Sequence, residues 1–217
     1  MTAGRLRLLL FASMKTIVYV DGFNLYYGAL KGTPCKWLDL DKLCRLLLPQ
    51  HQIIKIKYFT ARVSARPLDP DQPTRQQTYL RALQTLPNFE IILGHFLAHE
   101  ISMPLASNPQ KSVRVIKTEE KGSDVNIAAH LVHDGYRGLY DLAVLITNDS
   151  DLLEPVKVVR YELNLPIGIL NPQQHPSRVL LQHASFFKKI RQGTLAASQF
   201  PSPLQDANGT FHKPDGW

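Results

Sequence analysis

Residues 18–28 read VYVDGFNLYYG, an apolar run that ends abruptly in an aspartate, a glycine and an asparagine. With the residues before it, KTIVYV (15–20) is continuously apolar, which is typical of a strand buried on both faces. Asp, Gly and Asn are all common turn residues, so a tight turn is one interpretation of Asp21. The other interpretation is that the strand end presents Asp21 to a cation.

A second apolar run ends in the same way. DLAVLIT (141–147) is followed by acidic residues, so that VLITNDSD spans residues 144–151. Asp and Ser are frequent helix caps, and this alternative to a metal site stays open for NDSD alone. If the two strands are neighbours, Asp21, Asp149 and Asp151 share one edge of the sheet. Carboxylates that close cannot all stay ionised without a cation, and Mg²⁺ or Mn²⁺ prefers oxygen ligands.

A third acidic position lies in KGSDV, residues 121–125. Asp124 opens a predicted helix just after Gly122, and Lys121 would lie near any phosphate bound there. A capping role for Ser123 or Asp124 is the alternative interpretation of this element.

Predicted strands and helices alternate along the chain, which favours an α/β fold with a mainly parallel sheet and helices on both faces. In such sheets the ligand site lies beyond the carboxyl ends of the strands. We expect residues 101–110 to be irregular and 112–118 to form one arm of a hairpin. The predicted strands are 15–20, 52–63, 89–96, 141–147 and 166–170, and the predicted helices are 38–48, 74–86, 121–135 and 152–163.

The chain divides into three predicted parts. Residues 1–13 form an N-terminal extension, because a second Met at position 14 directly precedes the first strand. This extension begins like a signal peptide, but its apolar stretch is very short. Residues 14–191 form one domain. Residues 192–217 are rich in Ser, Pro, Gln, Asn and Gly without periodicity, so we expect a flexible C-terminal tail.

The composition favours some partners over others. Lys and Arg number 25 against 18 Asp and Glu, a net charge of +7 that favours polyanions such as nucleic acid. No apolar run approaches the length that spans a membrane, so we expect no membrane partner. Cys35 and Cys44 match no zinc or redox spacing, which favours two reduced thiols in a cytoplasmic protein.

With DGFNLYY, KGSDV and TNDSD in this order, the sequence resembles NYN domains of the LabA/DUF88-like branch, which belong to the PIN-like nuclease superfamily. The resemblance covers about residues 15–190. The motif positions of that group match here as Asp21, Asn24, Lys121, Asp124, Thr147, Asp149 and Asp151.

This resemblance implies a PIN-like three-layer α/β/α fold and a Mg²⁺- or Mn²⁺-dependent ribonuclease. Its catalytic residues would be Asp21, Asp124, Asp149 and Asp151, with the metal held by the first three. Asn24, Thr147, Ser150 and Lys121 would be secondary, and Asp39 or Asp41 would fill the family's further acidic position. The products would carry 5′-phosphate and 3′-hydroxyl ends. Such domains often dimerise, so a homodimer is a further expectation.

An acidic site needs surrounding cations to hold RNA. The candidate substrate-binding residues are Lys55, Lys57, Arg62, Arg114 and Lys117. Phe23, Tyr26 and Tyr27 either stack on bases or pack a helix onto the sheet. His130 and His133 have a spacing that zinc can use, but no third ligand is evident, so polar-face histidines are favoured.

Two other functions compete with the nuclease. A haloacid-dehalogenase-like phosphatase also places an Asp at a strand end, but it needs a second Asp two residues later, where this chain has Phe23. The other alternative is a non-catalytic RNA- or protein-binding regulatory module.

Overall fold

Strands β1 (Lys15–Asp21) and β6 (Leu142–Ile146) lie at the centre of a six-stranded sheet in the computed structural model, which describes residues 14–217. The strand order is β3-β2-β1-β6-β7-β8, and every neighbouring pair is parallel. The other strands of this sheet are β2 (Gln52–Thr60), β3 (Phe89–Leu93), β7 (Ile167–Asn171) and β8 (Phe186–Lys189). The predicted α/β class and parallel sheet are confirmed. The sheet has one more strand than predicted, because residues 186–189 pair with β7.

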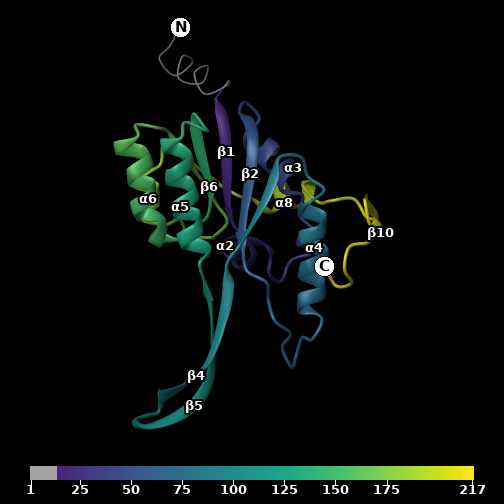
Figure 1. Cartoon of the computed structure of the whole chain (residues 1–217), viewed down its shortest axis with the longest axis vertical. Helices are drawn as coiled ribbons and strands as arrows, with labels where there is room; N and C mark the ends of the chain where they lie inside the picture. Colours follow the sequence, from purple (N-terminus) through teal and green to yellow (C-terminus); the bar gives the residue numbers. More distant parts are fainter. Residues whose placement is uncertain (1–13) are drawn as a thin grey trace.

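Alternate residues of β1 enter two separate hydrophobic cores, one on each face of the sheet. Val18 and Val20 face one core, and Ile17 and Tyr19 face the other. These four side chains are at most 3% exposed, which explains why the strand is apolar on both faces. The result is the expected three-layer α/β/α arrangement (Figure 1).

Helices from different parts of the chain cover the two faces. The first face carries α3 (Leu40–Leu47), α4 (Gln72–Leu83) and α8 (Gln192–Ala197), together with the short α2 (Gly22–Leu25) and its π-helical continuation η1 (Tyr26–Leu30). The second face carries α5 (Ser123–Tyr136), α6 (Leu153–Lys157), the π-helical turn η3 (Val158–Glu162) and α7 (Arg178–His183). A 3₁₀ turn, η2 (Ser150–Leu152), precedes α6. None of the helices within residues 14–217 has the length and apolar character needed to cross a membrane.

A long antiparallel hairpin leaves the body of the protein beside the carboxyl ends of the strands (Figure 1). It consists of β4 (His95–Leu105) and β5 (Asn108–Lys121), which within residues 14–217 pair only with each other. We call it the arm. The prediction that residues 101–110 are irregular is wrong for most of that range, because β4 runs through Pro104. Proline is tolerated there since the arm is two-stranded and both strands are edges.

The C-terminal residues pack against the core. Phe200 and Phe211 are buried beside the indole of Trp37, with ring centroids 5.7 and 6.4 Å away. A small hairpin of β9 (Leu204–Asp206) and β10 (Gly209–Phe211) carries the second of these rings. The prediction of a flexible tail over 192–217 is therefore wrong. The predicted extension, residues 1–13, lies outside the described residues.

Candidate metal centre

Three carboxylates meet at the carboxyl end of the central sheet. Asp21 is the last residue of β1, Asp149 follows the neighbouring β6, and Asp124 lies in the first turn of α5. Each of the three offers an oxygen, and these oxygens all lie within 4.8 Å of one another. We call them the Asp cluster. The parallel pairing of β1 with β6 is what places the first two side by side, as the sequence predicts.

Asp21 is the most buried member of the Asp cluster, with only 5% of its surface exposed. Burial, with smaller contributions from the charges of Asp124 and Asp149, raises the pKa of Asp21 to about 6. Hydrogen bonds from Asn24 and Thr147 act in the opposite direction. Burial also raises the pKa of Asp124, followed by the charge of Asp149. Carboxyl groups held in this way gain most from a bound cation.

The turn after β1 holds Asp21 in place. Its Oδ1 accepts the backbone N–H of Asn24 at 2.9 Å, so the aspartate caps α2. Glycine is required at position 22, because a Cβ there would lie 2.7 Å from the carbonyl oxygen of Phe59 on β2. The turn and cation interpretations of DGFN are thus compatible, since capping uses only one of the two carboxylate oxygens.

The loop after β6 is held to the same turn. The Asn24 side-chain carbonyl accepts the backbone N–H of Asn148 at 3.0 Å. Asp149 Oδ1 accepts the backbone N–H of Asp151 at 3.0 Å, so this aspartate is also a cap. Asp151 and Ser150 are exposed at the start of η2. Asp151 is not one of the three clustered residues, but its charge helps to raise the pKa of Asp124.

A family comparison bears directly on this arrangement. The family model described as "NYN domain" matches residues 15–191, which includes every element that contributes to the Asp cluster. The chain belongs to the NYN domain family. This family is part of the PIN-like superfamily, in agreement with the fold.

Two relatives of this NYN domain are informative in different ways. The chain is 32% identical over 236 residues to 6-hydroxy-3-succinoylpyridine 3-monooxygenase of Pseudomonas putida, covering 94% of this chain and 75% of that protein. A crystal structure of a protein of unknown function from Vibrio parahaemolyticus superposes with a TM-score of 0.57 at 18% identity. That match covers 82% of this chain and 94% of the other, and it supports the fold alone.

The sequence analysis of this NYN domain did not single out two residues near the Asp cluster, Glu120 and Asn148. Glu120 Oε1 accepts both the backbone N–H and the hydroxyl of Ser123, at 3.1 and 2.8 Å. Its charge adds to the field that raises the pKa of Asp124. Asn148 accepts the N–H of Ser177 at 2.6 Å and so ties the acidic loop to the start of α7. The two consecutive glutamates directly before KGSD are the sequence feature that could have indicated a role for Glu120. The predicted cap, Ser123, is the first helical residue, and Gly122 with a φ of 98° is the N-cap.

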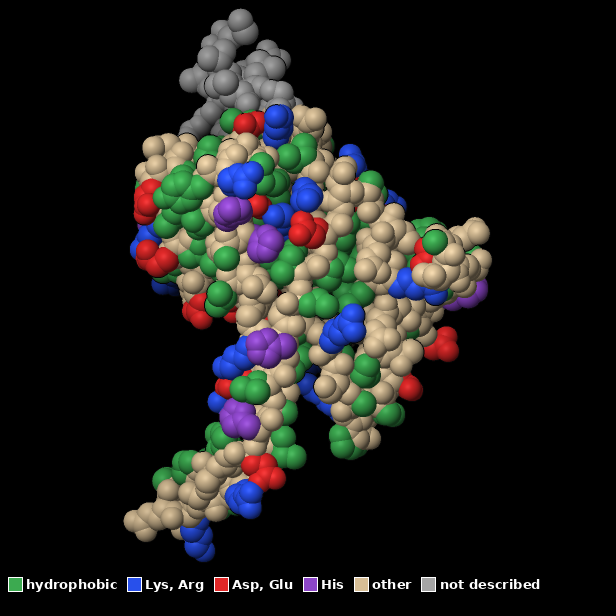
Figure 2. All heavy atoms as spheres, in the orientation of Figure 1, with side chains coloured by type: hydrophobic (Ala, Val, Ile, Leu, Met, Phe, Trp, Pro, Cys, Tyr) green, Lys and Arg blue, Asp and Glu red, His purple; other side chains and the backbone are tan. Residues whose placement is uncertain are grey.

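The predicted RNA-contacting cations do not form one patch. Lys57 is a correction, because its ammonium lies in a buried ion pair with Asp134 at 2.6 Å and cannot reach a substrate. Lys55, also on β2, pairs with Glu90 of the neighbouring β3 at 3.3 Å. On the arm, Arg114 pairs with Glu100 and Lys117 pairs with Glu119. Basic, acidic and apolar side chains are mixed along the arm (Figure 2). Arg62 is exposed in the loop after β2.

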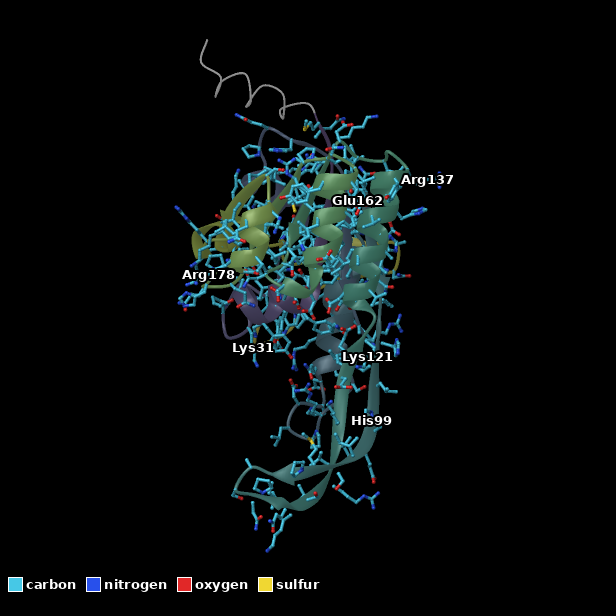
Figure 3. All side chains as sticks on the ribbon, turned by 90° about the vertical axis from the view of Figure 1, so that its left-hand side faces the viewer. Lys31, His99, Lys121, Arg137, Glu162 and Arg178 are labelled. Carbon is cyan, nitrogen blue, oxygen red and sulfur yellow. The ribbon has the colours of Figure 1, made fainter. Side chains whose placement is uncertain are left out.

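Lys121 is better placed than the other predicted cations. It ends β5, three residues before Asp124, and its side chain is half exposed while pairing with Glu119 at 3.1 Å. Figure 3 places both Lys121 and Lys31 at the end of the body from which the arm leaves. The Lys31 ammonium lies 4.9 Å from the ring centroid of Tyr27, which is itself exposed.

The remaining sequence candidates have structural partners. Asp39 caps α3 by accepting the N–H of Lys42, and Asp41 pairs with Arg45, so neither joins the Asp cluster. The Phe23 ring packs edge-on against Phe96 at the base of the arm, with centroids 5.7 Å apart. His130 Nδ1 lies 3.1 Å from the Lys57 ammonium in the buried ion-pair network, which fits a structural role better than a zinc ligand.

Proposed function

We propose that this NYN domain is a divalent-cation-dependent ribonuclease that hydrolyses internal phosphodiester bonds of RNA. The observation that carries the proposal is the Asp cluster, in which three carboxylate oxygens from three elements lie within 4.8 Å of one another. The chain's membership in a nuclease-type superfamily supports the same conclusion.

The donor set fits a hard cation such as Mg²⁺ or Mn²⁺, because all of its ligands are carboxylate oxygens. Asp21, Asp124 and Asp149 would hold the ion. When bound, such an ion supplies positive charge for the scissile phosphate and lowers the pKa of a coordinated water. It would also offset the burial and the mutual repulsion that raise the pKa of Asp21 and Asp124.

The protein's own side chains supply orientation. The exposed carboxylate of Asp151 accepts a hydrogen bond from the attacking water, and Lys121 faces the phosphate from the end of β5. A bond forms between the water oxygen and phosphorus, and the bond from phosphorus to the 3′-oxygen breaks. The 3′-oxygen then takes up a proton, which leaves 5′-phosphate and 3′-hydroxyl ends. Thr147 and Asn24 act indirectly, by fixing the positions of Asp21 and of the loop that carries Asp149.

The test is a cleavage assay on mixed single-stranded and structured RNA with Mg²⁺ or Mn²⁺. We expect cleavage by the native chain that is lost in EDTA and in Asp149→Asn. Asp71→Asn is the matched control, because Asp71 is exposed and makes no capping hydrogen bond with its side chain. Full activity of Asp149→Asn would overturn the assignment. An inactive but folded and metal-binding protein would favour the non-catalytic binding module.

A second candidate function rests on the Pseudomonas relative, whose name describes oxygenation of a hydroxypyridine. Identity of 32% across nearly the whole chain favours a related substrate class. In such a reaction one atom of O₂ enters the ring, and a two-electron donor such as NADH reduces the other to water. Incubation with 6-hydroxy-3-succinoylpyridine, ¹⁸O₂ and NADH, followed by mass spectrometry, tests it. Because carbon 3 of this compound carries the succinoyl group, the product to look for is a pyridine whose new hydroxyl oxygen comes from ¹⁸O₂, with or without loss of that group. Such a product would support this function, and unchanged substrate would exclude it for this compound.

The state of the two cysteines bears on where the protein works. A cytoplasmic location is supported by Cys35 and Cys44, which are both buried and unpaired.

The phosphatase alternative is disfavoured, because Phe23 occupies the position of the required second Asp and packs against Phe96.

A further inference from the structure

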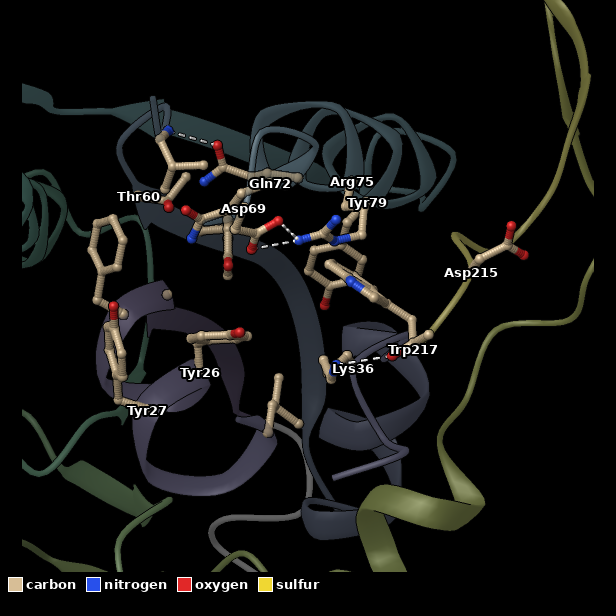
Figure 4. A pocket seen from close by; sticks show the side chains of 17 residues that line it. Tyr26, Tyr27, Lys36, Thr60, Asp69, Gln72, Arg75, Tyr79, Asp215 and Trp217 are labelled. Carbon is tan, nitrogen blue, oxygen red and sulfur yellow. Dashed lines mark hydrogen bonds and ion pairs between the residues drawn. The ribbon is translucent and has the colours of Figure 1, made fainter. Parts of the chain in front are cut away.

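A cavity of about 400 Å³ lies beside the Asp cluster, on the side of β2. Its walls come from α2 and η1, from β2, from the start of α4 and from residues 215–217 at the C-terminus (Figure 4). Gly22, directly after Asp21, is part of the lining. The volume lies within the range of small-molecule sites, and no residue of the Asp cluster lines it.

Aromatic rings form two opposing parts of this cavity (Figure 4). Tyr26 and Tyr27 stand on the helical side, with ring centroids 5.3 Å apart. Tyr79 and Trp217 stand on the other side, with centroids 5.6 Å apart. Tyr79 is buried and its hydroxyl is fixed by a 2.9 Å hydrogen bond to the carbonyl of Leu38. Rings held in this way favour a flat, unsaturated ligand.

Two cations face the same space. Arg75 uses one terminal nitrogen, Nη2, to donate to both oxygens of Asp69 at 2.6 Å. Within the described residues, no hydrogen bond is made by its Nε or Nη1. The Lys36 ammonium donates to the carbonyl of Gly216 at 3.1 Å, which uses one of its three protons. The side chain of Asp215 points away from the other labelled residues in Figure 4. The free donors favour an anionic group on the ligand.

A buried amide adds a third requirement. Gln72 is one of the lining residues, and its side-chain oxygen is shielded from solvent and has no hydrogen-bond partner within residues 14–217. An unpartnered buried amide is unfavourable, so a donor on a ligand would satisfy it. By contrast, the neighbouring Gln76 is fully used, since it bonds to Val63 and Ala61.

We propose that this cavity binds a planar heteroaromatic ring that carries an anionic group. The ring packs against the aromatic walls, the anion meets Arg75 and Lys36, and a ring N–H or O–H meets Gln72. Two sources share this chemistry, a nucleotide and a small heteroaromatic acid. Only the nucleotide source rests on the proposed ribonuclease function, because the base of an RNA strand would then enter the cavity while its backbone crosses the Asp cluster.

The experiment measures binding by calorimetry and saturation-transfer NMR on the full chain in EDTA, so that the result is independent of metal and of cleavage. The probes are AMP and nicotinate, with ribose 5-phosphate and adenosine as the anion and ring controls. We expect AMP to bind at least tenfold more tightly than ribose 5-phosphate and adenosine, or nicotinate to bind at least tenfold more tightly than its uncharged amide, nicotinamide. Binding of AMP alone identifies a nucleotide site, and binding of nicotinate alone identifies a site for free aromatic acids.

Two variants test the residues. Arg75→Ala and Gln72→Leu should each weaken binding of the favoured probe about tenfold, whereas Arg178→Ala, an exposed arginine on α7, should leave it unchanged. Gln72→Leu should also melt at the same or a higher temperature than the native chain, because it removes an unpartnered amide. A merely structural Gln72 would instead lower the melting temperature. Failure of both probes to bind at millimolar concentration, or binding that neither variant weakens, would overturn the proposal even if RNA cleavage is observed.

Discussion

The hydroxyl of Thr147 donates a 3.0 Å hydrogen bond to Asp21. The same hydroxyl oxygen accepts the backbone N–H of Asp149 at 3.1 Å. Thr147 is fully buried at the end of β6, so its side chain has no alternative partner in solvent. One hydroxyl therefore fixes the positions of two members of the Asp cluster, and its effect on the site should be measurable.

Replacement of Thr147 by Val should weaken both the fold and the metal centre. The change leaves a buried carboxylate oxygen and an N–H without a partner, at a cost of about 1–3 kcal/mol in unfolding free energy. We expect Mn²⁺ affinity to fall about 10–100-fold, as is usual when a residue that orients metal ligands is lost. Thr147→Ser keeps the hydroxyl and should retain most of the affinity. Equal losses in both variants would show that the methyl group, and not the hydroxyl, matters.

Asp21 should make the stability of the metal-free protein depend on pH. Burial raises its pKa from 3.8 to about 6, so the folded state favours the protonated form. This contribution is fully present below pH 4 and is lost as the pH rises through about 6. Asp21→Asn should therefore stabilise the metal-free chain at pH 7, on the order of 1–3 kcal/mol, and have little effect at pH 4. Urea unfolding in EDTA at the two pH values measures this, and a less stable variant at pH 7 would refute it.

The buried ion pair between Lys57 on β2 and Asp134 on α5 should make the stability of the protein sensitive to loss of one partner. The side chains of Lys57 and Asp134 are 7% and 4% exposed, and Tyr19 also donates to Asp134 at 2.7 Å. Asp134→Ala leaves a buried ammonium unpaired and should cost about 3–5 kcal/mol. The triple variant Tyr19→Phe, Lys57→Met, Asp134→Leu removes the ion pair together with the tyrosine hydroxyl and should recover most of that loss. Chemical denaturation compares them, and a triple variant as unstable as the single one would contradict this account.

The C-terminal hairpin should contribute strongly to stability. Phe211 is buried against Trp37, and the Arg81 guanidinium lies 4.1 Å from its ring centroid. Phe211→Ala should lower the unfolding free energy by about 3–5 kcal/mol. Leu68→Ala is the control, because Leu68 is 99% exposed and its loss should change stability by less than about 0.5 kcal/mol. Similar melting temperatures for both variants would mean that the C-terminal segment does not contribute to the core in solution.

The sequence predicted the Asp cluster because its signals are local. Asp21 and Asp149 each follow an apolar strand directly, and parallel neighbours end at the same sheet edge. The flexible tail was predicted wrongly, because burial of Phe200 and Phe211 depends on Trp37, more than 150 residues earlier, and leaves no local period. Lys57 was misplaced for a related reason. The strand alternates Ile with Lys, as an exposed strand does, but α5 covers that face and supplies Asp134 as a partner.

The arm was only half predicted from sequence. Residues 112–118 alternate as a strand does, but Pro104 and the polar residues around it suggested an irregular segment. Such residues are tolerated in a two-stranded hairpin that projects into solvent, where packing imposes little on either face. The cavity next to the Asp cluster was not foreseen, because the C-terminal Trp217 forms part of its wall.

The central claim is that Asp21, Asp124 and Asp149 share a divalent cation, and Mn²⁺ titration followed by electron paramagnetic resonance tests it most directly. We predict that the native chain binds Mn²⁺ in a site that competes with Mg²⁺. Asp21→Asn, Asp124→Asn and Asp149→Asn should each weaken this binding at least tenfold, whereas Asp71→Asn should not. Absence of Mn²⁺ binding at millimolar concentration, or binding that survives all three cluster substitutions, would contradict the claim.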